Sequence, residues 1–209
     1  MNFAMAEDAG HFRYVKGVVL VGERVATKGQ VFSHGDLLAT KKDSMAIVTL
    51  NDGSTIKLNE NTTIAVDHLS NDLGPTKVTL GLGSVVVNAL KSALKNNLKE
   101  KFILKTKSVA MGVRGTTFFA SFGKQGSSDI WMCVNEGTVA IRSSVEKEAK
   151  LVNAGEGVQV KNGEKTSKPT PLVWTKKLNW NLSSESDADF KDTVNIEEAY
   201  TNPLDFNYE

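Results

Sequence analysis

Few side chains of this chain stand at spacings that support catalysis or metal binding. The three histidines, His11, His34 and His68, lie far apart, and none has a second ligating residue at a spacing typical of a metal site. The single cysteine, Cys133, lies in the apolar segment DIWMCVN with no adjacent base to form a reactive thiolate. We therefore expect surface or loop histidines, a buried strand cysteine, and no metal site.

Two other stretches resemble ligand loops only in part. The GLGSV stretch at 81–85 lacks the lysine of a phosphate-binding loop and the third glycine of a nucleophile elbow, so Ser84 is predicted to be a turn residue. The NDGSTIKLNENT stretch at 51–62 is rich in oxygen atoms but lacks the spacing of a calcium loop. The sequence thus predicts no catalytic residue, no cofactor and no enzymatic activity.

Arg114, Gly115 and Thr116 interrupt two apolar runs in MGVRGTTFFASF at 111–122. Gly115 permits the positive φ of a corner that turns one strand into the next. An arginine between the core residues Val113 and Phe118 needs acceptors, and its five donors can hold carbonyls or a carboxylate. Two interpretations stay open: a structural clasp across neighbouring turns, which we favour, and an anion-binding arginine in a cleft.

The elements that would position these residues are short β-type segments separated by turn signals. The chain is 40% hydrophobic, with 17 glycines and only 4 prolines, which is typical of a β-rich protein with many turns. Asp52 and Gly53 separate two apolar alternations, which predicts a hairpin with a type I′ turn. About eleven strands are predicted, at 14–21, 35–40, 45–50, 54–58, 62–66, 77–87, 102–113, 115–122, 128–135, 137–143 and 157–161.

One insert departs from this pattern. Leu90, Leu94 and Leu98 are four residues apart with lysines between them, so the spacing predicts a short amphipathic helix near 88–101. Such a helix can bind a membrane surface or a partner, but we favour a helix that covers an open end of the β body. The predicted fold class is all-β: a compact β-solenoid or helical-barrel-like body with one capping helix.

The chain changes character after Lys165. Two prolines and the tryptophans Trp174 and Trp180 predict an extended strap that packs back on the body. From residue 183 onward the tail holds 8 acidic residues and one lysine, whereas residues 1–182 hold 24 basic and 16 acidic residues. The basic charge of the body is diffuse, which argues for a solvated surface and against nucleic acid as a partner.

The N-terminus carries a weak export signature. Ala4, Met5 and Ala6 have the small-x-small form of a signal-peptidase site, although the apolar segment that should precede it is missing. We expect an exported chain that begins inside the end of an export signal. No run approaches the roughly 18–20 apolar residues of a membrane span.

Several segments, taken in order, resemble the FecR domain family. They are KGQVFSHGDLLATKKDSMAIVTLNDGSTIKLNENTTIAV at 28–66, LGLGSVVV at 80–87, FILKTKSVAMGVRGTTFFASF at 102–122, VNEGTVAI at 134–141 and VNAGEGVQV at 152–160. The hallmark is an extended T-x-x-A-x-x-x-V-R-G-T-x-F pattern that contains Arg114, Gly115 and Thr116. The resemblance implies short strands wound in a solenoid-like manner and residence outside the cytoplasm.

Typical family members are membrane-anchored regulators that relay the state of an outer-membrane transporter to an extracytoplasmic sigma factor. Within these 209 residues we find no segment that resembles the sigma-binding part of those regulators. We therefore expect an export-signal remnant at 1–11, a FecR-like domain at 12–165, and a strap with an acidic tail at 166–209. The tail matches no family that we can name.

The expected function is a non-enzymatic, periplasmic or otherwise exported module that binds a protein partner or senses a signal in the bacterial cell envelope. Peripheral membrane contact is possible, and the sequence does not fix an oligomeric state. The alternative is a lectin-like module in which Trp131, Trp174 or Trp180 stacks on sugar rings. Burial of these tryptophans would argue against the lectin.

Overall fold

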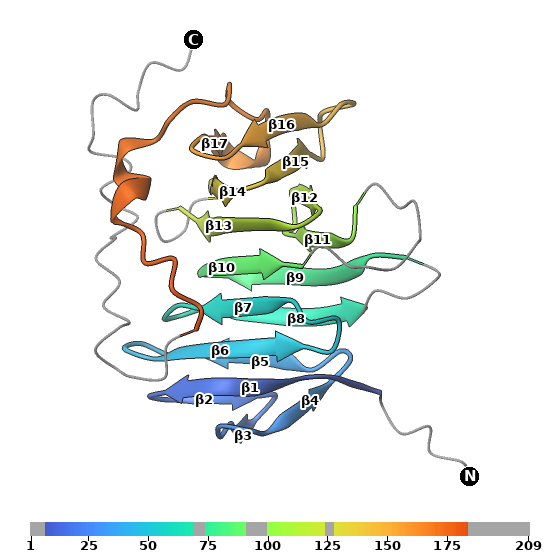
Figure 1. Cartoon of the computed structure of the whole chain (residues 1–209), viewed down its shortest axis with the longest axis vertical. Helices are drawn as coiled ribbons and strands as arrows, with labels where there is room; N and C mark the ends of the chain where they lie inside the picture. Colours follow the sequence, from blue (N-terminus) through green and yellow to red (C-terminus); the bar gives the residue numbers. More distant parts are fainter. Residues whose placement is uncertain (1–6, 69–73, 91–99, 124–127, 184–209) are drawn as a thin grey trace.

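Two β-sheets packed face to face form the body of the computed structural model, which describes residues 7–68, 74–90, 100–123 and 128–183 (Figure 1). Sheet A has eight strands in the order β17 (Gly157–Val160), β14 (Ile130–Glu136), β13 (Thr116–Phe122), β10 (Ser84–Ala89), β7 (Thr55–Leu58), β6 (Met45–Leu50), β1 (Asp8–Lys16) and β4 (Val31–Ser33). Sheet B has nine strands in the order β16 (Lys150–Asn153), β15 (Thr138–Ser143), β12 (Val109–Val113), β11 (Phe102–Lys105), β9 (Thr76–Leu82), β8 (Thr63–His68), β5 (Leu37–Thr40), β2 (Val19–Val21) and β3 (Arg24–Val25). Two short 3₁₀ turns follow, η1 (Lys161–Gly163) and η2 (Val173–Lys177).

The core lies between the sheets, and the two sheets differ in their outer faces. On β8 of sheet B, the buried Ile64 and Val66 alternate with more exposed residues, as expected for a strand with one covered face. On β10 of sheet A, the consecutive residues Val85, Val86 and Val87 are all buried. Sheet A is therefore covered on both faces at this strand.

Several long apolar segments are not single strands. The predicted strand at 77–87 is divided into β9 and β10 by Gly83, which has φ +80°, and the two parts lie in different sheets. The predicted strand at 14–21 is divided in the same way at Gly17, with φ +70°. The chain thus crosses repeatedly between the sheets while it advances from β1 towards β17 (Figure 1).

The all-β prediction is confirmed, but the solenoid or barrel is not. Both sheets are open, and their named strands pair antiparallel except for β9 with β11. The predicted capping helix near 88–101 is not confirmed, since 91–99 lie outside the described residues and Asn88 and Ala89 belong to β10.

The hairpin at Asp52 and Gly53 forms, although its turn type differs from the prediction. Strands β6 and β7 pair antiparallel, with Thr49 opposite Thr55. The N–H of Gly53 donates to the carbonyl of Leu50 (2.9 Å), and only Gly53, at φ +85°, has a positive φ in this turn. These features describe a type I turn closed by a glycine bulge, because one left-handed residue suffices in a three-residue loop.

The sheet edges are short or covered. At the N-terminal end of the stack, β3 and β4 are two and three residues long. At the other end, the edge of sheet A at β17 pairs with a later segment through Gly157 opposite Thr170 and Val160 opposite Thr166. Short or covered edges offer little template for pairing with further strands.

Candidate functional site

The largest feature outside the core is an extended segment on the outer side of sheet A. Residues 166–183, here called the strap, begin by pairing with the free edge of β17. The N–H of Gly157 donates to the carbonyl of Thr170 (2.8 Å), and the N–H of Thr170 donates back to Gly157 (3.1 Å). The N–H of Ser167 donates to Gln159 (2.8 Å). In Figure 1 the strap, orange to red, then passes along one side of the stack.

Beyond this pairing the strap covers a second apolar cluster, separate from the inter-sheet core. The buried members on the sheet are Val86, Phe119, Trp131 and Cys133, which come from β10, β13 and β14. The strap contributes the buried side chains Leu172, Trp174 and Leu178, with Trp180 and Leu182 partly buried against them. Burial of a large apolar side chain contributes roughly 1.5–3 kcal/mol, so this cluster holds the strap firmly. We call this covered surface the strap face.

The tryptophans lie inside this cluster rather than on an open groove. Trp131 is 2% exposed and Trp174 is 3% exposed, and their rings meet edge to face at 5.9 Å. Phe119 makes a similar edge contact with Trp174 at 6.1 Å. Sugar stacking needs an open ring face, which Trp131 and Trp174 do not offer. Only Trp180 is partly exposed, so the lectin alternative gains no support.

Polar bonds also join the strap to the sheet. Lys57 on β7 is completely buried, and its ammonium group donates to the carbonyl of Asn179 (2.5 Å). Further along, the guanidinium of Arg13 donates to the carbonyl of Ser183 (3.1 Å). A buried ammonium must be hydrogen-bonded to be tolerated, so Lys57 fixes where the strap crosses β7.

The clasp predicted for Arg114 exists, but a different residue makes it. Arg114 is exposed at the turn between β12 and β13, where Gly115 has φ +62°. The buried hydroxyl of Thr116 donates to the carbonyl of Thr138 (3.0 Å), which ties this turn to the one between β14 and β15. In that turn, any Cβ added to Gly137 would lie 2.8 Å from the Gly115 carbonyl.

The buried-clasp role of Arg114 was therefore wrong. The turn lies beyond the ends of the buried strands, so the long side chain of Arg114 reaches solvent. The FecR-like V-R-G-T and E-G patterns are in contact through Thr116 and Gly137. This contact between the two turns is a structural explanation for both sequence patterns.

The other residues considered for chemistry are engaged in structure or lie apart. Asp52 accepts hydrogen bonds from the N–H of Ser54 (2.8 Å) and from the hydroxyl of Thr76, and Glu60 accepts one from Asp43 N–H (2.8 Å). Burial raises the pKa of the Cys133 thiol far above its ordinary value, which leaves the thiol protonated. Among the described residues, no three histidine, cysteine, aspartate or glutamate side chains gather as a metal site.

The sequence predicts a strap that packs back on the body, but sequence reasoning missed that the strap covers the outer face of sheet A. The signal was present in strands that are apolar at consecutive positions, such as 85–87 and 130–134, because consecutive apolar residues require cover on both faces. The burial of Lys57 carried no such signal, since it depends on where the strap crosses β7.

These features describe a two-sheet β-domain in which the turns at Gly115 and Gly137 contact each other and the strap covers one sheet. The family model described as FecR protein matches residues 36–140, about half of the chain. The chain therefore belongs to the FecR family. The matched part contains Asp52, Gly53 and the Arg114–Thr116 pattern but not the strap.

Solved structures support the fold. Two crystal structures of a candidate anti-sigma factor from Parabacteroides distasonis ATCC 8503, at 2.50 Å and 1.65 Å resolution, each match with a TM-score of 0.53 and 19% identity. Each match covers 65% of this chain and 59% of the solved chain. No curated protein sequence matches. Within the described residues, no helix is both long enough and apolar enough to cross a membrane.

Proposed function

We propose that this protein is a non-enzymatic regulatory module that binds a protein partner, or senses a signal, in the bacterial cell envelope. The observation that carries the proposal is the FecR family match over residues 36–140. The similarity of the fold to a candidate anti-sigma factor is consistent with a signalling role.

The strap face adds a physical argument for binding. It holds an extended segment by two means, an edge pairing at β17 and an apolar cluster around Trp174. Extended segments added to a sheet edge, with side chains in apolar contacts, are a common mode of peptide recognition. The fold is thus suited to carrying extended chains, and here one such site is filled by the protein's own residues.

Export is part of the proposal. Ala4, Met5 and Ala6 form the small-x-small pattern, and they lie outside the described residues, as does most of the acidic tail. Cell fractionation of the natural full-length protein tests this part. Recovery with a periplasmic marker is expected, and recovery with a cytoplasmic marker would contradict export.

The regulatory role is tested in cells. Deletion of the gene is expected to change the transcription of a narrow set of genes, and the full-length protein is expected to restore it. In parallel, a photo-crosslinker placed at exposed positions such as Arg114 is expected to capture one envelope protein repeatedly. Unchanged transcription together with no recurrent crosslink would overturn the proposal.

A control variant unfolds the FecR domain while the full-length chain is still produced. Phe118→Asp places a carboxylate at a completely buried position of the inter-sheet core, which the folded domain cannot accommodate. A variant that is exported but no longer folded should lose both the crosslink and the complementation. If it retains both, the FecR body is not the functional part.

A further inference from the structure

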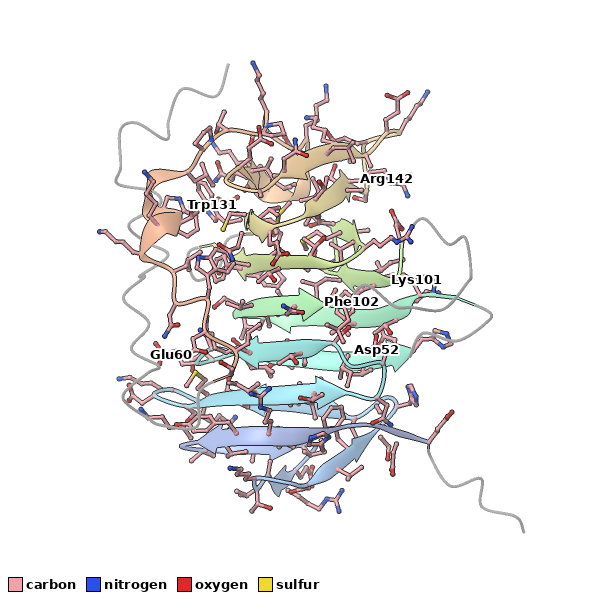
Figure 2. All side chains as sticks on the ribbon, viewed as in Figure 1. Asp52, Glu60, Lys101, Phe102, Trp131 and Arg142 are labelled. Carbon is pink, nitrogen blue, oxygen red and sulfur yellow. The ribbon has the colours of Figure 1, made fainter. Side chains whose placement is uncertain are left out.

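A shallow basic hollow lies on the outer side of sheet B, away from the apolar cluster that the strap covers on sheet A. It has a volume of about 270 Å³ and lies between the β11–β12 turn and the loop that follows β15. Its lining residues are Lys105, Thr106, Lys107, Ser108, Val109, Ala110, Arg142, Ser143, Ser144 and Glu146. In Figure 2, Arg142 lies far from Trp131, which marks the strap face.

Strand register builds the hollow. Lys105 on β11 is opposite Ala110 on β12, and Ala110 is opposite Arg142 on β15. The three side chains therefore stand in one row on the outer face of sheet B, because the intervening residues of these strands are buried. A methyl group between two long cationic side chains leaves a space with a positive rim.

The loops around the hollow are held in place. The hydroxyl of Thr106 accepts hydrogen bonds from the N–H groups of Ser108 (3.3 Å) and Val109 (3.1 Å). The N–H of Ser144 donates to the carbonyl of Ser108 (2.8 Å), which joins the two loops. A site on fixed loops loses little conformational entropy when it binds a ligand.

The hollow carries more positive than negative charge. Within the part of the chain that the structure describes, Lys105, Lys107 and Arg142 make no ion pair. The carboxylate of Glu146 also lines the hollow, but it accepts bonds from the Ser143 N–H (3.1 Å) and from the Thr166 hydroxyl (2.6 Å). The side chains of Lys105, Lys107 and Arg142 thus outnumber the one carboxylate in the lining, Glu146, whose oxygens already accept hydrogen bonds.

We propose that the basic hollow binds an acidic peptide segment of a protein partner, with its carboxylates held by Lys105 and Arg142. This inference rests on the proposed function, since it names the chemistry of the partner. The volume is slightly below the roughly 300–1,000 Å³ of pockets for drug-sized ligands, which suits one or two side chains.

An apolar rim favours a peptide over a free anion. Val145, next to the lining residues Ser144 and Glu146, is 62% exposed, and Leu151 on the neighbouring strand β16 is 64% exposed. An acidic segment that also carries apolar residues can use both the cations and this rim, whereas inorganic phosphate can use only the cations. The partner segment is thus expected to mix carboxylates with aliphatic side chains.

The test uses the full chain and a fluorescein-labelled peptide of mixed glutamate and leucine, measured by fluorescence anisotropy. Lys105→Glu/Arg142→Glu is expected to weaken binding at least about tenfold, because both contacting charges are reversed. The control Lys41→Glu/Lys42→Glu makes the same net change on an exposed loop and is expected to weaken binding less than about twofold. Equal weakening by both pairs would overturn the hollow, since it would show only long-range charge attraction.

Tighter binding of inorganic phosphate than of the peptide would overturn the acidic-peptide assignment.

The crosslink in cells separates this inference from the proposed function. A cellular partner whose crosslink survives Lys105→Glu/Arg142→Glu would overturn the hollow but leave the proposed function standing. Loss of that crosslink in this variant alone, and not in Lys41→Glu/Lys42→Glu, is the expected result.

Discussion

Glu146 provides a test in which stability, pH and strap attachment are linked. Its carboxylate accepts hydrogen bonds from the Thr166 hydroxyl and N–H and from the Ser143 N–H, and it pairs with Lys150 at 3.3 Å. Burial opposes ionisation, but these bonds outweigh it and lower the pKa of Glu146 from 4.5 to about 2. Glu146 therefore anchors the start of the strap to the loop after β15.

The sign of the pH dependence follows from this direction. Because the folded-state pKa is the lower one, the stabilisation is complete above about pH 4.5 and is lost as the pH falls towards about 2. A change from 4.5 to about 2 corresponds to at most about 3 kcal/mol. Solvent screening at this loop reduces the expected contribution to about 1–2 kcal/mol.

Glu146→Gln removes the charge while keeping the size of the side chain. We expect it to lower the free energy of unfolding by about 1–2 kcal/mol at pH 7, with the difference from the parent shrinking as the pH approaches 2. Urea denaturation at a series of pH values measures both features. Glu148→Gln, on the same loop but at an exposed position, should change stability by less than about 0.5 kcal/mol. A Glu146→Gln effect that is equal at every pH would refute the reasoning.

Three further predictions concern the turns and the strap, and each is tested by chemical denaturation. Gly53→Val should destabilise by about 1–3 kcal/mol, because a β-branched residue resists φ +85°; an unchanged midpoint would mean that this turn is not formed. Thr116→Val should cost about 1–3 kcal/mol through the lost buried hydrogen bond, while the exposed Arg114→Ala should stay within about 0.5 kcal/mol; the reverse order would restore the arginine clasp. Trp174→Ala should cost about 3–5 kcal/mol and speed proteolysis of the strap, and the partly buried Trp180→Ala should cost less; equal small losses would mean that the strap does not depend on its aromatic cluster.

Local patterns predicted the local structure well. The strand at 45–50 is predicted with the bounds that β6 has, because its apolar run and the Asp52–Gly53 turn are both contained in about ten residues. The buried Cys133 and the absence of a base beside it could also be read from one strand. Such features depend only on residues that are close together in the sequence.

Non-local features could not be predicted in this way. Pattern alone does not show that β9 and β10 belong to different sheets, since the apolar residues on both sides of Gly83 also suit one continuous strand. The exposure of Arg114 depends on how far its turn extends past the strands. The basic hollow needs three strands in register, so Lys105 and Arg142 give no signal in the sequence that they belong together.

The two outer faces of the molecule imply different consequences of mutation. On sheet A, the chain supplies its own ligand, so Trp174 and Lys57 act on the stability of the protein. On sheet B, Lys105 and Arg142 make no ion pair among the described residues, so reversal of their charges removes no ion pair that stabilises the fold. Variants of the strap face should therefore lose stability first and binding only as a consequence, whereas variants of Lys105 and Arg142 should lose binding while the protein stays folded. A single surface that served both purposes could not separate the two effects.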